Sequence, residues 1–280
     1  MSDLIGAGDF IPWEGGCALI GRAANITPTH SHYAIQIGIG AEPGIRFRAD
    51  EHAEWMDYMA AVIPSRQPHM MDATCVSASA VIFIEPETPV GRTLIERYLP
   101  GGIASLGEGA YQAAAMHLFS EWRRHGHARA TVTALDAVIA SLTDGTRAMV
   151  VSDERIIRAV TYIKSHLDAS LTLEEVAGEA CLSPSRFRHL FVEQTGTALR
   201  PYVLWRRFLR AWEIVARGDS LSTAAHSAGF ADAAHLTRTS HRMFGFAPSG
   251  LAVNAARREL DAGSAGVDSR FVQAGHARGQ

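Results

Sequence analysis

A pattern of two short helices joined by a tight turn occurs twice near the C-terminus, within residues 171–249. The first copy reads TLEEVAGEACLSPSRFRHLFVEQTG and the second reads SLSTAAHSAGFADAAHLTRTSHRMFG. Phe187 and Leu236 are 49 positions apart, and so are Gly196 and Gly245. Because a structural repeat keeps such a spacing constant, we expect two helix-turn-helix units of the same design.

Residue types that start and stop helices delimit both copies. Thr172 and Glu175 form the pattern of a capping box, and Ser183 precedes Pro184 as expected at a helix start. The glycines at the end of each copy are typical helix stops. The expected N-terminal caps are Thr172, Ser183, Ser220 and Asp232.

The segment between the copies predicts one longer helix. It has Pro201 at its start and Gly218 just past its end. Such a helix is roughly 25 Å long. With the width of the flanking units, it can hold two docking helices about 34 Å apart, the distance between successive major grooves on one face of DNA.

Residues 152–258 resemble the DNA-binding domain of the AraC/XylS family of bacterial transcription regulators. The stretch AGFADAAHLTRTSHRMFGFAPS carries the resemblance, since it follows the family's order of GF, HF-S-R, FK and G-x-x-P. Leu236 and Ser240 stand where the family usually has Phe, and His241 stands where it usually has Lys. The resemblance implies sequence-specific binding of double-stranded promoter DNA by both units. It also implies a small-molecule or ion effector, RNA polymerase and a second copy of the chain as partners.

The outward positions of the second helix in each unit are the candidate DNA contacts. The resemblance places the base-reading positions at Ser185, Arg188, His189, Ala234, His235 and Arg238. Arg238 is the strongest candidate in the second unit because arginine pairs bidentately with guanine, whereas Ala234 offers only a methyl group. Candidate phosphate contacts are Arg186, Arg206, Arg207 and Arg242. The competing interpretation of these arginines is a solvated surface.

Ser240 occupies a position that the helical register buries beside Leu236, Met243 and Phe244. Its hydroxyl would lie in a site shaped for an aromatic ring, leaving either a polar cavity or a compensating hydrogen bond. A cavity predicts that Ser240→Phe stabilises the unit, whereas a repacked core predicts overpacking. We expect the cavity.

Charge is distributed unevenly along the chain. Residues 1–151 hold 10 basic and 16 acidic residues, a net charge of -6, whereas residues 152–258 hold 14 basic and 10 acidic residues, a net charge of +4. The overall charge of -3 therefore conceals a basic C-terminal part. This asymmetry is typical of an acidic sensor joined to a DNA-binding module.

The length of 280 residues accommodates two domains, each with its own core. We expect residues 1–150 to sense an effector and dimerise, residues 151–258 to bind DNA and residues 259–280 to be a disordered tail, with the junction near Val150. The 3 cysteines are isolated, the N-terminus has no basic segment followed by an apolar run, and no stretch reaches about 18 apolar residues. These features predict a cytoplasmic protein without a membrane span.

The N-terminal half has the pattern of strands separated by glycine and proline. HSHYAIQIGIG alternates, which predicts one strand with Tyr33, Ile35, Ile37 and Ile39 on one face and His30, His32, Gln36 and Gly38 on the other. Residues 76–89 repeat a strand and a turn, and residues 60–70 end a strand in a turn that carries His69. Many short strands favour a small cupin-like β-barrel. The predicted fold class is α+β, with an all-α C-terminal domain.

Two helical stretches follow the strands, at Gly107–Arg124 and Thr131–Leu142. Each has an apolar stripe that we expect to pair between subunits of a homodimer. The stripes are Ala113, Met116, Leu118, Phe119 and Trp122, then Val132, Leu135, Val138, Ile139 and Leu142.

The motif His30-x-His32-x-x-x-Gln36, followed by His69, resembles the metal-ligand arrangement of the cupin barrel, with Gln36 where metal-binding cupins usually have Glu. Strand alternation puts both histidines and Gln36 on one face, and three imidazoles can hold a divalent transition metal. Two other interpretations stay open. One is an effector pocket at the same four residues without metal, and the other is a set of histidines satisfied by local hydrogen bonds.

Common catalytic motifs are absent from the sequence, among them G-x-x-x-x-G-K-[ST], G-x-S-x-G, H-E-x-x-H and G-x-G-x-x-G after a strand. We therefore expect no catalytic residues, no enzyme and no certain cofactor. The remaining enzymatic alternative is a cupin-type metalloenzyme with a helical accessory domain, built on His30, His32 and His69. A scaffold protein that does not bind DNA is a third interpretation, which the basic balance of residues 152–258 disfavours.

Overall fold

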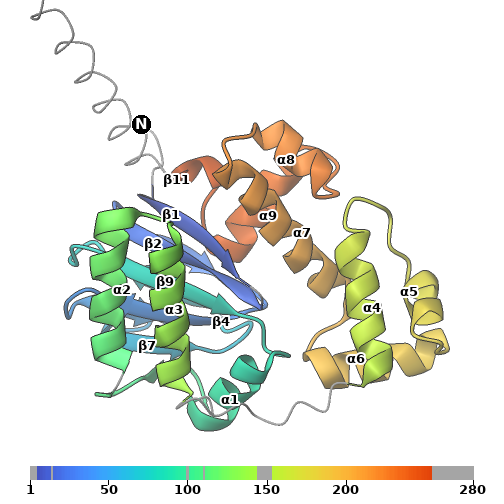
Figure 1. The fold of residues 1–280 in the computed structure, drawn as a ribbon, viewed down its shortest axis with the longest axis horizontal. Coiled ribbons are helices and arrows are strands. Elements are labelled where there is room, and N and C mark those ends of the chain that lie inside the picture. The colour runs from blue at the N-terminus through green and yellow to red at the C-terminus, as the bar shows by residue number, and fades with distance from the viewer. Residues whose placement is uncertain (1–4, 14, 99–100, 110, 144–152, 254–280) are drawn as a thin grey trace, which may run out of the picture.

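The computed structural model describes residues 5–13, 15–98, 101–109, 111–143 and 153–253 (Figure 1). The predicted junction near Val150 and the predicted tail at residues 259–280 lie outside the described residues. In the described part, a strand-rich N-terminal half precedes a helical half that ends in one short strand. The predicted α+β class is confirmed.

The larger sheet has the strand order β10-β7-β4-β9-β2-β1-β11, with only the β1–β11 pair parallel. Its strands are β1 (Gly6–Trp13), β2 (Gly16–Ala23), β4 (Ile35–Gly40), β7 (Ala60–Ile63), β9 (Ser79–Ile84), β10 (Ala104–Ser105) and β11 (Leu251–Val253). Ile35, Ile37 and Ile39 belong to the core beneath α2 (Tyr111–His125) and α3 (Arg129–Leu142). These two helices cover one face of the sheet (Figure 1).

The smaller sheet packs against the other face. Its order is β3-β8-β5-β6, formed by β3 (Thr27–His30), β5 (Ile45–Arg48), β6 (Met56–Tyr58) and β8 (His69–Asp72). Phe47 and Met71 from this sheet share a core with Ile63 from the larger one. The sheets are so close that a Cβ on Gly38 would lie 2.6 Å from the Phe47 ring, which explains the glycine there.

The prediction of one alternating strand over residues 30–39 is wrong at its beginning. His30 ends β3 in the smaller sheet, His32 and Tyr33 lie in the connection, and only Ile35 begins β4. The chain passes from the smaller sheet to the larger one between His30 and Ile35, so β3 and β4 do not form one continuous strand. His69 also lies in a strand rather than in a turn, because it pairs with His30 across β3 and β8.

The predicted pairing of α2 and α3 between subunits is wrong for most of their apolar residues. Leu118 and Phe119 of α2 and Leu135 and Val138 of α3 are buried within the chain. Met116 is the large exception, with 65% of its surface exposed. The short helix α1 (Pro89–Tyr98) follows β9 at the end of the sheet that faces the helical half.

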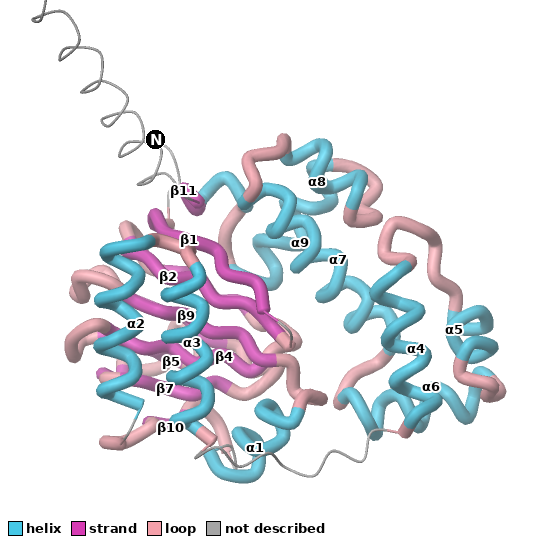
Figure 2. Tube along the Cα trace, in the orientation of Figure 1, coloured by secondary structure: helices cyan, strands magenta, loops and turns pink. Residues whose placement is uncertain are grey.

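The helical half contains both predicted units. Its helices are α4 (Glu154–Ser165), α5 (Leu173–Glu179), α6 (Pro184–Thr195), α7 (Leu199–Ala216), α8 (Leu221–Ser227) and α9 (Ala233–Phe244), followed by a 3-10 turn at Pro248–Gly250. Helices α5 and α6 form the first unit, α8 and α9 form the second, and α7 joins them (Figure 2).

The predicted boundaries of the helices in the two units are confirmed, whereas α7 begins at Leu199, two residues before the predicted start at Pro201. The Thr172–Glu175 capping box is complete, and Ser183, Ser220 and Asp232 each accept a hydrogen bond from a backbone N–H of the next turn. Gly196 and Gly245 end α6 and α9 with φ of 72° and 77°, a left-handed conformation that glycine adopts without steric cost. Local sequence signals therefore determine where these helices begin and end.

The core of the helical half continues into the larger sheet. Trp205 and Phe244 pack with Phe83 of β9, and the ring centroids of Phe83 and Phe244 are 4.8 Å apart. After the second unit the chain returns to the sheet, where β11 runs parallel to β1 with Gly6 opposite Leu251. Figure 2 shows this strand beside β1. The strand-rich half thus touches the helical half along an extensive contact.

Candidate DNA-reading helices and a buried histidine cluster

The predicted DNA contacts on α6 lie on one exposed face. The N-terminal cap and Pro184 begin the helix, and its buried face, with Phe187 and Phe191, packs into the core. The opposite face is free of intramolecular packing. Exposed there are Ser185, Arg186, Arg188 and His189.

Helix α9 repeats this arrangement in the second unit. Leu236 and Phe244 are buried, while Ala234, Arg238 and Arg242 are exposed. His235 is half-buried, because its ring lies against Phe230 with 5.2 Å between centroids. The structure thus gives each unit an outward face that carries the predicted arginine.

The prediction that Arg206 contacts phosphate is wrong, whereas Arg207 stays a candidate that also has backbone partners within the chain. Arg206 is mostly buried in an ion pair with Glu85 of the strand-rich half. Arg207 donates hydrogen bonds to the carbonyl oxygens of Leu167, at 2.8 Å, and Ala169, at 2.6 Å. Arg206 is engaged inside the protein and Arg207 at its surface, which a helical pattern alone cannot reveal.

The expected cavity at Ser240 is also wrong. Ser240 is fully buried, and its hydroxyl donates a 2.6 Å hydrogen bond to the carbonyl oxygen of Phe246. The alternative of a compensating hydrogen bond applies, since the Ser240 hydroxyl has a partner within the unit.

Three histidines meet inside the strand-rich half. His30 ends β3, His69 begins β8 opposite it, and His32 follows in the connection to β4. The side chains are buried, and one ring nitrogen from each lies within 4.8 Å of the others. The predicted convergence is confirmed in space, although a pair of strands brings it about rather than one.

Each histidine uses its Nδ1 atom to bind the backbone. The partners are the carbonyl oxygens of Pro28 for His30 and Ala34 for His32, both at 2.8 Å, and that of Gln67 for His69, at 2.9 Å. A carbonyl oxygen only accepts, so Nδ1 must carry the proton in each ring. A neutral ring then presents an unprotonated Nε2, and such Nδ1 contacts are typical of metal-binding histidines.

Burial keeps these rings neutral. It lowers the pKa of His30 to about 3 and that of His32 to about 4, and it holds the pKa of His69 below its ordinary value. The positive charge that each neighbouring imidazole would carry also disfavours protonation of His30 and His69. The Nε2 atoms are therefore unprotonated at neutral pH.

Gln36 brings a further acceptor to the same point. Its Oε1 lies 2.9 Å from His32 Nε2 and 3.2 Å from His69 Nε2. With Nδ1 protonated, these contacts place an oxygen acceptor against nitrogen lone pairs. A rotated amide that donates its NH₂ group would resolve the conflict, and so would a cation between the atoms.

An apolar pocket adjoins the histidine cluster. His30, Gln36 and Met71 line it from the strand-rich half, and Phe244 and Phe246 line it from the end of the second helix-turn-helix unit. The Phe244 ring is 5.9 Å from the His32 ring between centroids. A ligand at this place would contact both halves of the chain.

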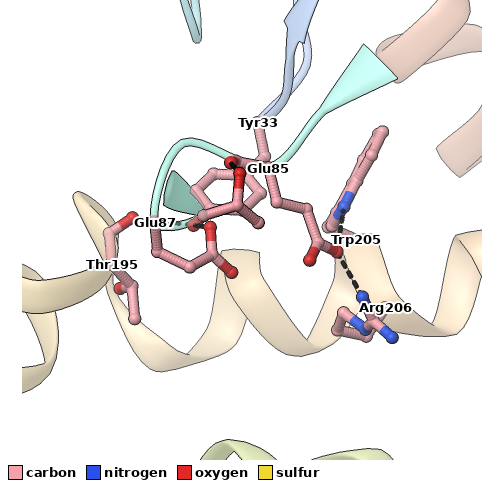
Figure 3. A network of polar contacts seen from close by, with 7 residues as sticks. Tyr33, Glu85, Glu87, Thr195, Trp205 and Arg206 are labelled. Carbon is pink, nitrogen blue, oxygen red and sulfur yellow. Dashed lines mark hydrogen bonds and ion pairs between the residues drawn. The ribbon is translucent and has the colours of Figure 1, made fainter. Parts of the chain in front are cut away.

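A second contact between the halves is polar and was missed by sequence reasoning (Figure 3). Glu85 accepts a 3.2 Å hydrogen bond from the Trp205 indole and pairs with Arg206. The Tyr33 hydroxyl lies 2.6 Å from Glu87 Oε2 and 2.7 Å from the carbonyl oxygen of Thr195, the last residue of α6. Residues so distant in sequence carry no shared signal.

Comparison with known proteins supports the same reading of the helical half. A family model described as a helix-turn-helix domain matches residues 176–254. This part of the chain is a DNA-binding helix-turn-helix domain of the AraC type, and the predicted resemblance is confirmed for it.

Two characterised regulators are similar over this region. The arabinose operon regulatory protein of Escherichia coli strain K12 is 31% identical over 99 residues, which cover 35% of this chain and 34% of that protein. The regulatory protein PocR of Salmonella typhimurium is 29% identical over 104 residues, which cover 37% of this chain and 34% of that protein. The chain thus matches about a third of the length of each relative.

The likeness of the whole fold extends further than the sequence match. The crystal structure of ToxT from Vibrio cholerae O395 superposes with a TM-score of 0.54, covering 85% of this chain and 96% of that chain at 11% sequence identity. At this identity the likeness concerns the fold alone. It includes the strand-rich half, which the sequence comparisons do not reach.

Proposed function

We propose that the chain is a sequence-specific DNA-binding transcription regulator whose strand-rich half senses an effector. The observation that carries this proposal is the pair of capped helix-turn-helix units, each with an exposed arginine face, in an AraC-type domain. Arg188 and Arg238 read bases in successive major grooves, with Ser185, His189, Ala234 and His235 beside them. Arg186 and Arg242 contact phosphates.

DNA selected from a random pool by the full chain tests this proposal. Arg188→Ala and Arg238→Ala should each weaken binding to the selected site by about 1–3 kcal/mol and relax preference at one base pair. Arg124→Ala, an exposed arginine on α2, is the matched control and should leave binding unchanged. Equal losses on selected and random DNA for both variants would overturn the base-reading assignment.

We further propose that the histidine cluster is the sensor's ligand site and binds a divalent transition metal. His30, His32 and His69 would hold the ion through Nε2, and Gln36 Oε1 would lie beside it. The fit rests on the convergence of unprotonated donors described above. A metal there supplies a fixed positive charge that ties β3, β8 and the connection to β4 together.

Metal analysis and thermal melting of the full chain test the site. Zinc or nickel should bind with a stoichiometry near one and raise the melting temperature, and His32→Ala should abolish both effects. His52→Ala, an exposed histidine outside the cluster, is the control. Failure of zinc, nickel, manganese and iron to bind or to change melting would overturn the metal proposal.

The apolar pocket beside the cluster suits an organic effector with a polar end. Among proteins of similar fold, ToxT structures are described with a bound unsaturated fatty acid and with a naphthalenyl butenoic acid. We infer that an effector of this chain would place its apolar part between Met71 and Phe244 and its polar end near His30 and Gln36.

The remaining partners follow from the class of protein. We propose that the regulator acts in the cytoplasm as a homodimer and contacts RNA polymerase at its promoters. In the described part of the chain, every helix is too short or too polar to cross a membrane.

A further inference from the structure

The strand-rich half contacts the first helix-turn-helix unit at the end of its DNA-reading helix. Tyr33 reaches the carbonyl oxygen of Thr195, Arg92 donates a 2.6 Å hydrogen bond to that of Gln194, and Arg66 donates to the hydroxyl of Thr197. Gln194 and Thr195 form the last turn of α6, and Thr197 leads into α7. These contacts determine where α6 ends relative to the sheets.

The Tyr33 hydroxyl has one hydrogen but two oxygen partners. Glu87 Oε2 is 2.6 Å away and the Thr195 carbonyl oxygen is 2.7 Å away. An ionised Glu87 only accepts, so Tyr33 could satisfy one of the two oxygens and would leave the other at close distance without a hydrogen. A protonated Glu87 donates to Tyr33, and Tyr33 then donates to Thr195. Only the protonated form satisfies all three groups.

The surrounding charges favour the same form. Glu85, two residues away, carries the ion pair with Arg206 of α7, so that guanidinium is already matched by a carboxylate. Arg92 of α1 is directed to backbone oxygens, those of Gln194 and of Glu87 itself. The Tyr202 hydroxyl of α7 also faces Glu87. A second carboxylate charge would therefore enter this contact without a cation of its own.

We propose that Glu87 and Tyr33 form a proton-dependent clamp on the first DNA-reading helix. With Glu87 protonated, the chain of hydrogen bonds from Glu87 through Tyr33 to Thr195 is complete and holds the end of α6 against the strand-rich half. When Glu87 loses its proton, the Tyr33 hydroxyl donates its hydrogen bond to the Glu87 carboxylate. The Thr195 carbonyl oxygen then loses its hydrogen bond from Tyr33. The proton leaves to solvent, and no other bond changes.

The working range of the clamp follows from its surroundings. Burial first, and then the charge of Glu85, raise the pKa of Glu87 from 4.5 to about 7. A raised pKa means that the contact is fully stabilised below pH 4.5 and loses this stabilisation as pH rises through about 7. The clamp therefore opens across neutral pH.

The consequence for DNA rests on the proposed function. The second unit is held to the same strand-rich half through Phe244, and α7 joins the two units. The sheets are thus a second connection between the two reading helices. Releasing Thr195 removes one of the three contacts that hold the end of α6. Helix α6 is then held less firmly relative to α9, which changes how well both fit successive grooves.

Hydrogen exchange of the full chain tests the clamp directly. After correction for intrinsic rates, the peptide spanning residues 192–199 should lose about tenfold in protection between pH 6 and pH 8. In Glu87→Gln, the side-chain amide donates to Tyr33 at any pH, so this peptide should stay protected at pH 6 and at pH 8. In Tyr33→Phe the same peptide should lack this protection at both pH values. Glu54 is an exposed carboxyl, so Glu54→Gln should behave as the wild type.

Two results would overturn the clamp: equal protection of this peptide in the wild type at both pH values, or an unchanged pH dependence in Glu87→Gln. Binding to the selected DNA site is measured in parallel, and its pH dependence should be smaller in Glu87→Gln than in the wild type. A chain that shows the exchange switch but binds no DNA would refute the regulator and leave the clamp standing.

Discussion

At the scale of single residues, hydrogen-bond partners decide roles that residue type leaves open. Ser240 lies where related domains usually carry an aromatic ring, yet its hydroxyl is bonded to Phe246 and its surroundings are packed. In the same way, the Nδ1 atoms of the three histidines donate hydrogen bonds to backbone carbonyl oxygens, which leaves three unprotonated Nε2 atoms close together. Both assignments depend on one bond per side chain.

Ser240→Phe should therefore destabilise the protein. The ring has no space to enter, and the Phe246 carbonyl loses its partner, so we expect a loss of about 1–3 kcal/mol. Urea denaturation of the full chain measures this loss as a lowered midpoint. Ser227→Phe, near the end of α8 and outside the buried set, serves for comparison. A raised midpoint for Ser240→Phe would mean that the site holds an unfilled cavity after all.

At the scale of elements, the turns of the two units adopt a left-handed conformation at different residue types. Both turns contain a left-handed residue, Cys181 with φ of 53° in the first and Gly229 with φ of 79° in the second. Gly229 has an additional constraint, because a Cβ there would lie 2.1 Å from the carbonyl oxygen of Leu167 and 2.8 Å from Arg207 Nε. The second turn is thus packed directly against the segment that follows α4.

Gly229→Ala should destabilise the helical half by more than about 1 kcal/mol. The left-handed backbone alone costs roughly that much for alanine, and the clash with a backbone oxygen adds to it. Gly178→Ala is the matched control, since Gly178 lies in α5 with open space around its Cβ, and it should be neutral or slightly stabilising. Thermal melting of the two variants compares them. Similar melting temperatures would show that the second turn is not constrained as described.

At the scale of the whole molecule, the two halves are joined by a buried ion pair as well as by aromatic packing. Glu85 is 2% exposed on its side chain and Arg206 is 18% exposed. The pair links the end of β9 to the middle of α7, and the clamp at Glu87 lies beside it. This contact joins the strand-rich half to the helical half.

Arg206→Ala should destabilise the chain by about 3–5 kcal/mol at neutral pH, because it leaves a buried carboxylate without its cation. Replacing both partners, as Glu85→Gln with Arg206→Met, should recover much of the loss. Arg200→Ala, an exposed arginine on α7, is the control. Calorimetry measures all three. A loss no larger than that of the control would show that the ion pair does not hold the halves together.

Much of the helical half was predictable because its signals are local. The capping box at Thr172, the caps at Ser183 and Asp232 and the terminal glycines act within one helical turn of their own positions. The outward faces of α6 and α9 follow from helical periodicity. The convergence of the three histidines was expected from the resemblance to the cupin motif, whereas their distribution over β3, β8 and the connection to β4 was not.

Capping and periodicity involve neighbouring residues, so the ends of α6 and α9 and the faces that they expose follow from the sequence. Three contacts depend on the tertiary structure. Arg206 pairs with Glu85, Tyr33 donates to the Thr195 carbonyl oxygen, and Phe244 lies beside the histidine cluster. These partners are 121 and 162 positions apart for the first two pairs. Side chains so distant carry no common pattern, since their meeting depends on how the sheets and helices pack.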